Sequence, residues 1–143
     1  MKILVGAIPG PEGEAALTAA VQEATLREAT LIVVDYVRVA QSETAGSRYQ
    51  RGSELLDRRR AELDAAGVEV IRLRPIGVST ASSELLRIAG EQAVDLIVIG
   101  IRRRSRVGKL VLGSNAQDIL LRAPCPVLAV KGDSDELEPA PST

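Results

Sequence analysis

Apolar residues along this chain of 143 residues gather in short runs that alternate with longer, more polar stretches. The runs are rich in Val, Ile and Leu, a composition typical of parallel strands that are buried on both faces. We predict strands over residues 2–8, 30–37, 68–73, 96–100 and 123–131.

The stretches between these runs carry signals for helices. Pro11, Glu12 and Glu14 are typical of a helix start, because proline fits the first turn and acidic side chains complement the positive end of the helix dipole. Apolar residues follow at spacings of three and four, which predicts an apolar stripe on this helix. Further helices are expected after residue 52, from Ser79 and Thr80, and from Ser114 or Asn115 as the cap.

The alternation of strands and helices predicts an α/β fold, in which one parallel sheet of five strands is covered by helices on both faces. Residues 1–131 make up this domain, and the acidic, aperiodic residues 132–143 are expected to form a disordered tail. The pattern alone does not fix the order of the strands. Sheets of this class bind ligands beyond the carboxyl ends of their strands, so the loops after the strands are the place to search for function.

Composition narrows the chemistry that the chain can perform. The sequence contains no histidine and one cysteine, which leaves little material for transition-metal sites or for catalysis by a histidine base. A formal net charge of −1 argues against a dedicated nucleic-acid binder. Cys125 has no partner for an internal disulfide, the opening MKILVGAIPG lacks a signal-peptide pattern, and no apolar run reaches the roughly 20 residues of a membrane span. We therefore expect a cytoplasmic protein.

The loop after the fourth predicted strand has the pattern of an anion site. It runs from Gly100 to Gly113 and leads directly into a helix that starts with Ser114 and Asn115. Glycines let backbone amides approach phosphate oxygens, and a helix start offers free N–H groups. The loop also contains the cationic residues Arg102, Arg103, Arg104, Arg106 and Lys109. An exposed turn with an ordinary helix cap is the competing interpretation, and the string is not a Walker A loop because its lysine precedes leucine.

These segments resemble the universal stress protein family. DLIVIG, the basic loop and KLVLGSNAQDILLRAPCPVLAVK are similar to the carboxy-terminal half of such proteins, whose pattern is G-x2-G-x9-G-[ST]. Gly100 occupies the first glycine position, Gly113 and Ser114 occupy the final pair, and Arg103 stands at the second glycine position. With the opening KILVGAIPGPEGEAAL, the resemblance covers about residues 1–131.

The resemblance implies a fold and a ligand. The expected strand order is 3-2-1-4-5, as in Rossmann-like, adenine-nucleotide α-hydrolase-like domains. The expected ligand is ATP or AMP, with or without Mg²⁺, held between the loops after strands 1 and 4 as a regulatory ligand. The cofactor-binding residues implied by the resemblance are Ile8, Tyr36, Gly100, Arg103, Arg104, Gly113, Ser114 and Asn115.

Two departures from the family pattern keep other functions open. Ile8 stands where nucleotide-binding members carry an acidic residue, although its side chain could pack against adenine, and Arg103 replaces a glycine. Tyr36 suits a wall of the site or plain packing equally well. A dimeric stress-response scaffold without nucleotide is therefore the alternative function. Slow ATP hydrolysis is the third, but the sequence favours a binding module, because it offers no histidine base and no obvious Mg²⁺-binding carboxylate beside the loop.

The resemblance also suggests a homodimer, and the fifth predicted strand supplies a physical reason. An unpaired apolar strand at the edge of a sheet invites pairing with a second copy through a two-fold interface. The strand residues expected at this interface are Val127, Leu128, Ala129 and Val130. Pro124 and Pro126 could instead blunt the edge enough for a monomer, because proline withholds ladder donors.

Overall fold

The five apolar runs form one parallel sheet. In the computed structural model, which describes residues 1–39, 53–102 and 112–132, its strands are β1 (Lys2–Gly6), β2 (Thr30–Val34), β4 (Val70–Leu73), β6 (Leu96–Ile101) and β7 (Val127–Lys131). They lie in the order β4-β2-β1-β6-β7, which confirms the predicted order 3-2-1-4-5. The register places Leu4 of β1 between Ile32 of β2 and Ile97 of β6.

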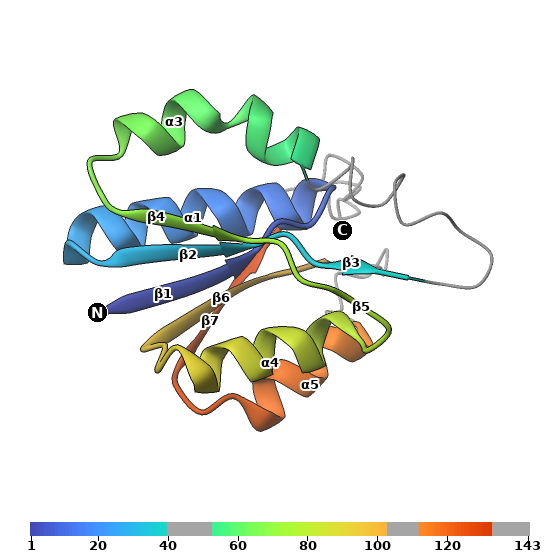
Figure 1. Cartoon of the computed structure of the whole chain (residues 1–143). Helices are drawn as coiled ribbons and strands as arrows, with labels where there is room; N and C mark the ends of the chain where they lie inside the picture. Colours follow the sequence, from blue (N-terminus) through green and yellow to red (C-terminus); the bar gives the residue numbers. More distant parts are fainter. Residues whose placement is uncertain (40–52, 103–111, 133–143) are drawn as a thin grey trace, which may run out of the picture.

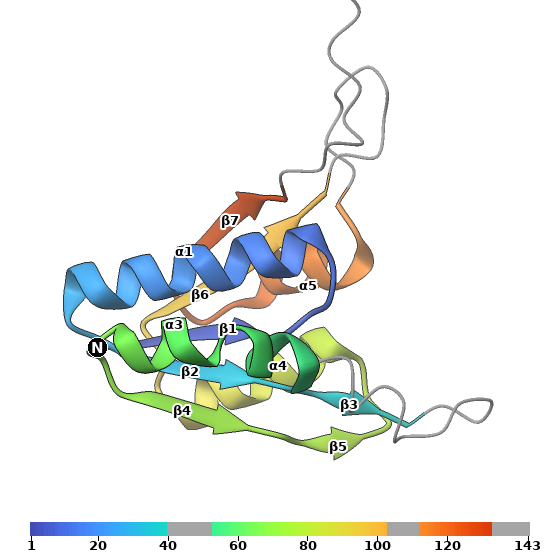
Figure 2. The same cartoon turned by 90° about the horizontal axis from the view of Figure 1, so that it is seen from above.

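Helices cover both faces of this sheet, as predicted (Figure 1, Figure 2). On one face lie α1 (Pro11–Arg27), the helical residues 53–58 and α3 (Arg60–Ala65), and on the other lie α4 (Ala81–Glu91) and α5 (Ser114–Arg122). Successive strand residues point to opposite faces, so Val5 packs under α1 while Leu4 packs under α4 and α5. Within the described ranges, no helix is long and apolar enough to cross a membrane.

Two short strands extend beyond the carboxyl edge of the sheet and were not predicted. The second predicted strand breaks after Val34, and the chain then forms β3 (Val37–Arg38), which pairs in parallel with β5 (Ile76–Gly77). The N–H of Val37 donates to the carbonyl oxygen of Pro75 at 3.0 Å, where β4 gives way to β5. This small ribbon carries Tyr36 and Arg38 past the end of β2, next to the loops that were expected to bind a ligand.

Three glycines allow close packing around the start of α1: two lie at the ends of β6 and β7, and the third lies in α1 itself, against the loop that precedes the helix. A Cβ atom on Gly100 would lie 2.0 Å from the carbonyl oxygen of Glu12, and one on Gly132 would lie 2.7 Å from the Glu12 backbone nitrogen. A Cβ atom on Gly13, inside α1, would lie 1.6 Å from the carbonyl oxygen of Ile8. All three distances are far below van der Waals contact. A larger residue at position 100 or 132 would push α1 away from the sheet, and one at position 13 would push it away from the loop that carries Ile8.

Gly13 and Gly90 both lie in helices and provide a matched pair of substitutions. Gly13→Ala should lower the free energy of unfolding by about 3 kcal/mol, because the new methyl group collides with the backbone. Gly90→Ala should raise it by about 0.5 kcal/mol, since alanine favours the helix and a Cβ there meets no described atom within 4 Å. Urea unfolding of both variants measures the difference, and equal effects would show that the α1 contact is not constrained as described.

Candidate functional site

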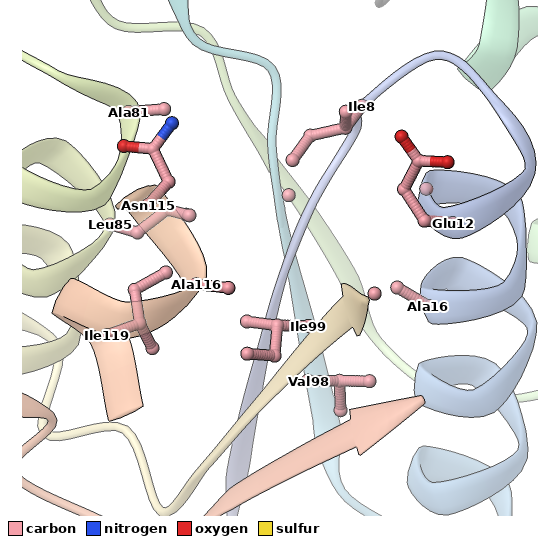
Figure 3. Close-up of a pocket in the computed structure, with 13 residues that line it drawn as sticks. Ile8, Glu12, Ala16, Ala81, Leu85, Val98, Ile99, Asn115, Ala116 and Ile119 are labelled. Carbon is pink, nitrogen blue, oxygen red and sulfur yellow. The ribbon is translucent and has the colours of Figure 1, made fainter. Parts of the chain in front are cut away.

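Two adjoining cavities lie at the carboxyl edge of the sheet. The inner one, of about 70 Å³, lies where the winding reverses between β1 and β6 and is lined mainly by apolar side chains such as Ile8 and Ile99 (Figure 3). The outer one, of about 240 Å³, is lined by Tyr36, Arg38 and the starts of α4 and α5. Asn115 lines both. Together they approach roughly 300 Å³, the lower end of the range for small-molecule sites.

The start of α5 presents backbone N–H groups that have no acceptor among the described residues. Gly113 is the N-cap residue and has no side chain to cap the helix, and the first intrahelical bond runs from the N–H of Gln117 to the Gly113 oxygen at 3.0 Å. The prediction that Ser114 or Asn115 caps this helix is therefore wrong, because they are its first two residues. No acidic residue lies in the first turn, so the positive end of the helix dipole is uncompensated.

Gly113 is not required by the local backbone. Its φ of −68° is open to any residue, and a Cβ atom there would meet none of the described atoms within 4 Å. Gly100 differs, because packing against α1 already explains why it is a glycine. Of the two family glycines that the structure describes, Gly113 is thus the one that the packing of the fold leaves unexplained.

At the neighbouring start of α4, two N–H groups are bound by protein side chains. The helix starts where Ser79 and Thr80 predicted it, with Thr80 as the N-cap, and the Thr80 hydroxyl oxygen accepts from the N–H of Ser83 at 3.1 Å. The side-chain oxygen of Asn115 accepts from the N–H of Ser82 at 3.2 Å. These bonds fix the Asn115 side chain between the two helices and leave the start of α5 as the open one.

A buried hydroxyl on α4 forms a hydrogen bond to a carboxylate on α5. The side chain of Ser82, which is buried, donates to Asp118 Oδ2 on α5 at 2.7 Å, and Arg122 donates to Oδ1 of the same carboxylate at 3.0 Å. The bond from Ser82, followed by that from Arg122, holds the pKa of Asp118 below its usual range. This connection sets the position of the α5 start relative to α4.

Ile8 and Glu12 border the inner cavity from the side of α1, across from Asn115 (Figure 3). Ile8 lies beyond the strand, because β1 ends at Gly6 and not at residue 8, and its side chain is half exposed. The Oε2 atom of Glu12 is buried and receives no hydrogen bond from the described residues. No carboxylate was expected beside the loop, but the structure places Glu12 in the wall of the site.

The structure brings most of the predicted residues together. Ile8, Gly100 and Asn115 line the inner cavity, Tyr36, Ser114 and Asn115 line the outer one, and Gly113 caps the helix that starts between them. The hydroxyl of Tyr36 donates to the Ser79 carbonyl oxygen at 2.6 Å, which holds the ring as a wall of the outer cavity. Arg103 and Arg104 lie outside the described residues, as does the predicted tail from residue 133.

Sequence reasoning missed Arg38 and gave Glu12 only a local role. Arg38 lies on β3, a strand of two residues that has no periodic signal of its own. It is exposed at the outer cavity and forms no ion pair with the rest of the described chain. Glu12 could have been noticed as a site residue because it is acidic and follows the first strand closely. An acidic residue at a helix start is also explained by the helix dipole, so this feature did not single it out.

The fold and the site together define a doubly wound α/β domain with a cavity where the winding reverses and an open helix start beside it. The family model described as "Universal stress protein family" matches residues 1–131, and this chain belongs to that family.

Individual relatives agree with this assignment. A universal stress protein from Mycolicibacterium smegmatis is 41% identical over 129 residues, which cover 90% of this chain and 96% of the relative. The structure of a universal stress protein from Archaeoglobus fulgidus has a TM-score of 0.77 at 28% identity, with 92% and 98% of the two chains covered. A structure from the same organism in complex with dAMP has a TM-score of 0.72 at 23% identity and the same coverage. Other structures of the family contain AMP or cAMP.

The link between α4 and α5 gives a pH-dependent prediction. The folded-state pKa of Asp118 lies below its unfolded value of 3.8, so its bonds stabilise the fold above that pH and are lost as the pH falls through the folded pKa. Ser82→Ala removes the largest cause of this shift. The variant should be less stable at pH 7, and its unfolding free energy should fall less between pH 7 and pH 3 than that of the wild type.

Ser83→Ala is the matched control, because Ser83 neighbours Ser82 but its hydroxyl contacts Thr80 and not Asp118. It should keep the wild-type dependence on pH in urea unfolding. If the unfolding free energy of both variants depends equally weakly on pH, the Ser82–Asp118 bond is not the cause of the weaker dependence.

Proposed function

We propose that this protein binds an adenine nucleotide, AMP or ATP, across the two cavities and acts as a regulatory module in a stress response. The observation that carries the proposal is the open start of α5, whose free N–H groups share a cavity with the Ser114 hydroxyl and the Arg38 guanidinium. Backbone N–H groups, the helix dipole and an arginine form a combination that suits phosphate. The dAMP complex of the Archaeoglobus fulgidus relative supports the choice of ligand class.

The two cavities suggest how the nucleotide is divided between them. In this proposal the phosphate binds Gly113, Ser114 and Asn115 at the start of α5, with Arg38 as countercharge. Arg103 and Arg104 remain further countercharges expected from the sequence. The inner cavity of about 70 Å³ is too small to enclose a base, so the base lies over it.

Apolar and aromatic groups are available for the base at that position. Ile8 is 46% exposed, so a flat ring placed on it would remove apolar surface from water. The ring of Tyr36, held by its hydrogen bond to the Ser79 carbonyl, provides a second wall on the side of the outer cavity. The proposed role is binding, and the cytoplasm remains the compartment predicted from the sequence.

We also propose a homodimer through β7, and the hydrogen bonds between β6 and β7 support a choice of the backbone groups that would form it. Gly132 N–H donates to Ile101 on β6 at 2.8 Å, and Pro126 accepts from Ile97 at 3.1 Å. Because ladder groups alternate between the two sides of a strand, the backbone groups of Ala129 point to the open edge. No other strand in the described part of the chain covers that edge. A dimer without nucleotide is the second candidate function, favoured by Ile8 in place of an acid.

Calorimetric titration with AMP and ATP tests nucleotide binding, and Gly113→Asp tests the site. An N-cap aspartate would occupy the free N–H groups of α5, which is worth a few tenths of a kcal/mol relative to glycine. Its negative charge at the helix start would add about 0.3–1 kcal/mol, while the same carboxylate repels phosphate. The variant should therefore melt higher than the wild type but bind at least tenfold more weakly. Since a damaged fold cannot raise the melting temperature, this combination isolates the site.

Gly113→Ser is the companion variant, because it can cap the helix without adding charge. We expect its affinity for AMP to lie between those of the wild type and Gly113→Asp. No heat from the wild type with either nucleotide at millimolar concentration would overturn the proposed function, and wild-type affinity in Gly113→Asp would remove the α5 start from it.

Light scattering tests the dimer. The wild type should have twice the chain mass of 15.2 kDa. Ala129→Pro should shift it to the monomer, because proline removes an N–H that points to the open edge while the ladder to β6 is kept. Ala129→Ser keeps that donor and should remain dimeric. A wild-type mass of one chain at micromolar concentration would contradict the interface.

A further inference from the structure

The helix dipole accounts for the charge of Glu12 but not for the burial of its carboxylate. Its Oε2 atom is buried, and none of the described residues donates a hydrogen bond to it. The side chain folds back over its own helix start, where Gly10 has a φ of 109° and a Cβ atom would lie 3.5 Å from both carboxylate oxygens. A buried acceptor without a donor destabilises the fold, and a charged one does so more strongly.

The backbone of Glu12 cannot move to relieve this cost. Its carbonyl oxygen lies against Gly100 at the end of β6, and its backbone nitrogen lies against Gly132 beyond β7, so closely that neither glycine has room for a Cβ atom. Glu14, in the same helical turn, differs, because its carboxylate reaches Arg58 and Arg59 at 3.7 Å each. The backbone of Glu12 is therefore held in place at the cavity wall.

We infer that the Glu12 carboxylate accepts hydrogen bonds from the ribose hydroxyls of the bound nucleotide. The inference rests on the proposed function and adds to it the residue that recognises the sugar. A carboxylate offers two acceptor oxygens, and the 2′ and 3′ hydroxyls of ribose are two adjacent donors. Acidic side chains bind ribose hydroxyls in the same way in dinucleotide-binding α/β folds.

The position of Glu12 favours the sugar over the other parts of the nucleotide. Glu12 lies across the inner cavity from Asn115 and the start of α5, where the phosphate would bind (Figure 3). A carboxylate repels phosphate, so the group it meets must be a neutral donor. Ribose is the part of a nucleotide joined directly to the phosphate, whereas the base lies further away and its flat faces suit the exposed Ile8.

The test compares AMP with 2′,3′-dideoxy-AMP by calorimetry, in EDTA, on the wild type, Glu12→Ala and Glu14→Ala. Both substitutions remove one negative charge from the first turn of α1, so their general effect on an anionic ligand is matched. The wild type and Glu14→Ala should bind AMP about tenfold more tightly than the dideoxy analogue. In Glu12→Ala the ratio of the two dissociation constants should fall to about one.

Other results would overturn the inference in distinguishable ways. A preference for AMP that persists in Glu12→Ala, is missing from the wild type, or requires added Mg²⁺ would show that Glu12 does not bind the hydroxyls directly, while nucleotide binding would stand. If neither compound binds the wild type, the proposed function fails as well. Urea unfolding of the two alanine variants verifies that both are folded.

Discussion

The start of α1 lies so close to the ends of β6 and β7 that only glycine fits at positions 100 and 132. This contact fixes one wall of the space at the carboxyl edge of the sheet, because the loop that carries Ile8 and the first turn that carries Glu12 cannot move without opening the core. The opposite wall is formed by α4 and α5, whose starts are tied together through Ser82 and Asp118. Both walls of the site are thus set by packing of the domain, before any ligand binds.

The two walls differ in charge, and this difference matches the parts of a nucleotide. The α5 start with Arg38 is positive and open, whereas the α1 side carries the carboxylate of Glu12. Between them the cavity is lined mainly by apolar side chains. An adenine nucleotide carries a group for each of these surfaces, with a phosphate for the α5 start, hydroxyl donors for the carboxylate and a flat base for the apolar lining. A simple inorganic anion would contact only the positive surface at the start of α5.

Much of the fold could be predicted, because buried parallel strands are recognisable in the sequence as runs of Val, Ile and Leu. The order of the strands came from the family resemblance, since the apolar pattern itself does not contain it. Strands as short as β3 and β5 show no periodicity, so the position of Arg38 could not be foreseen.

The site was predicted less completely, for reasons that individual residues make clear. Gly100 was expected to serve the ligand, but its contact with Glu12 already requires a glycine. Glu12 looked like an ordinary partner of the helix dipole, and only coordinates reveal that one of its oxygens is buried without a donor among the described residues. Ser114 or Asn115 was expected to cap the last helix, but Ser114 is its first residue and Gly113 is the cap, because sequence seldom resolves which of several neighbours is the cap.

The central claim is that the open start of α5 holds the phosphate of an adenine nucleotide. An NMR titration with AMP, followed through the backbone amide resonances, tests it most directly. The account predicts the largest shifts at Ser114, Asn115 and Ala116, whose N–H groups have no acceptor in the described structure. Unchanged resonances at these three residues, or shifts confined to the face covered by α1 and α3, would contradict it.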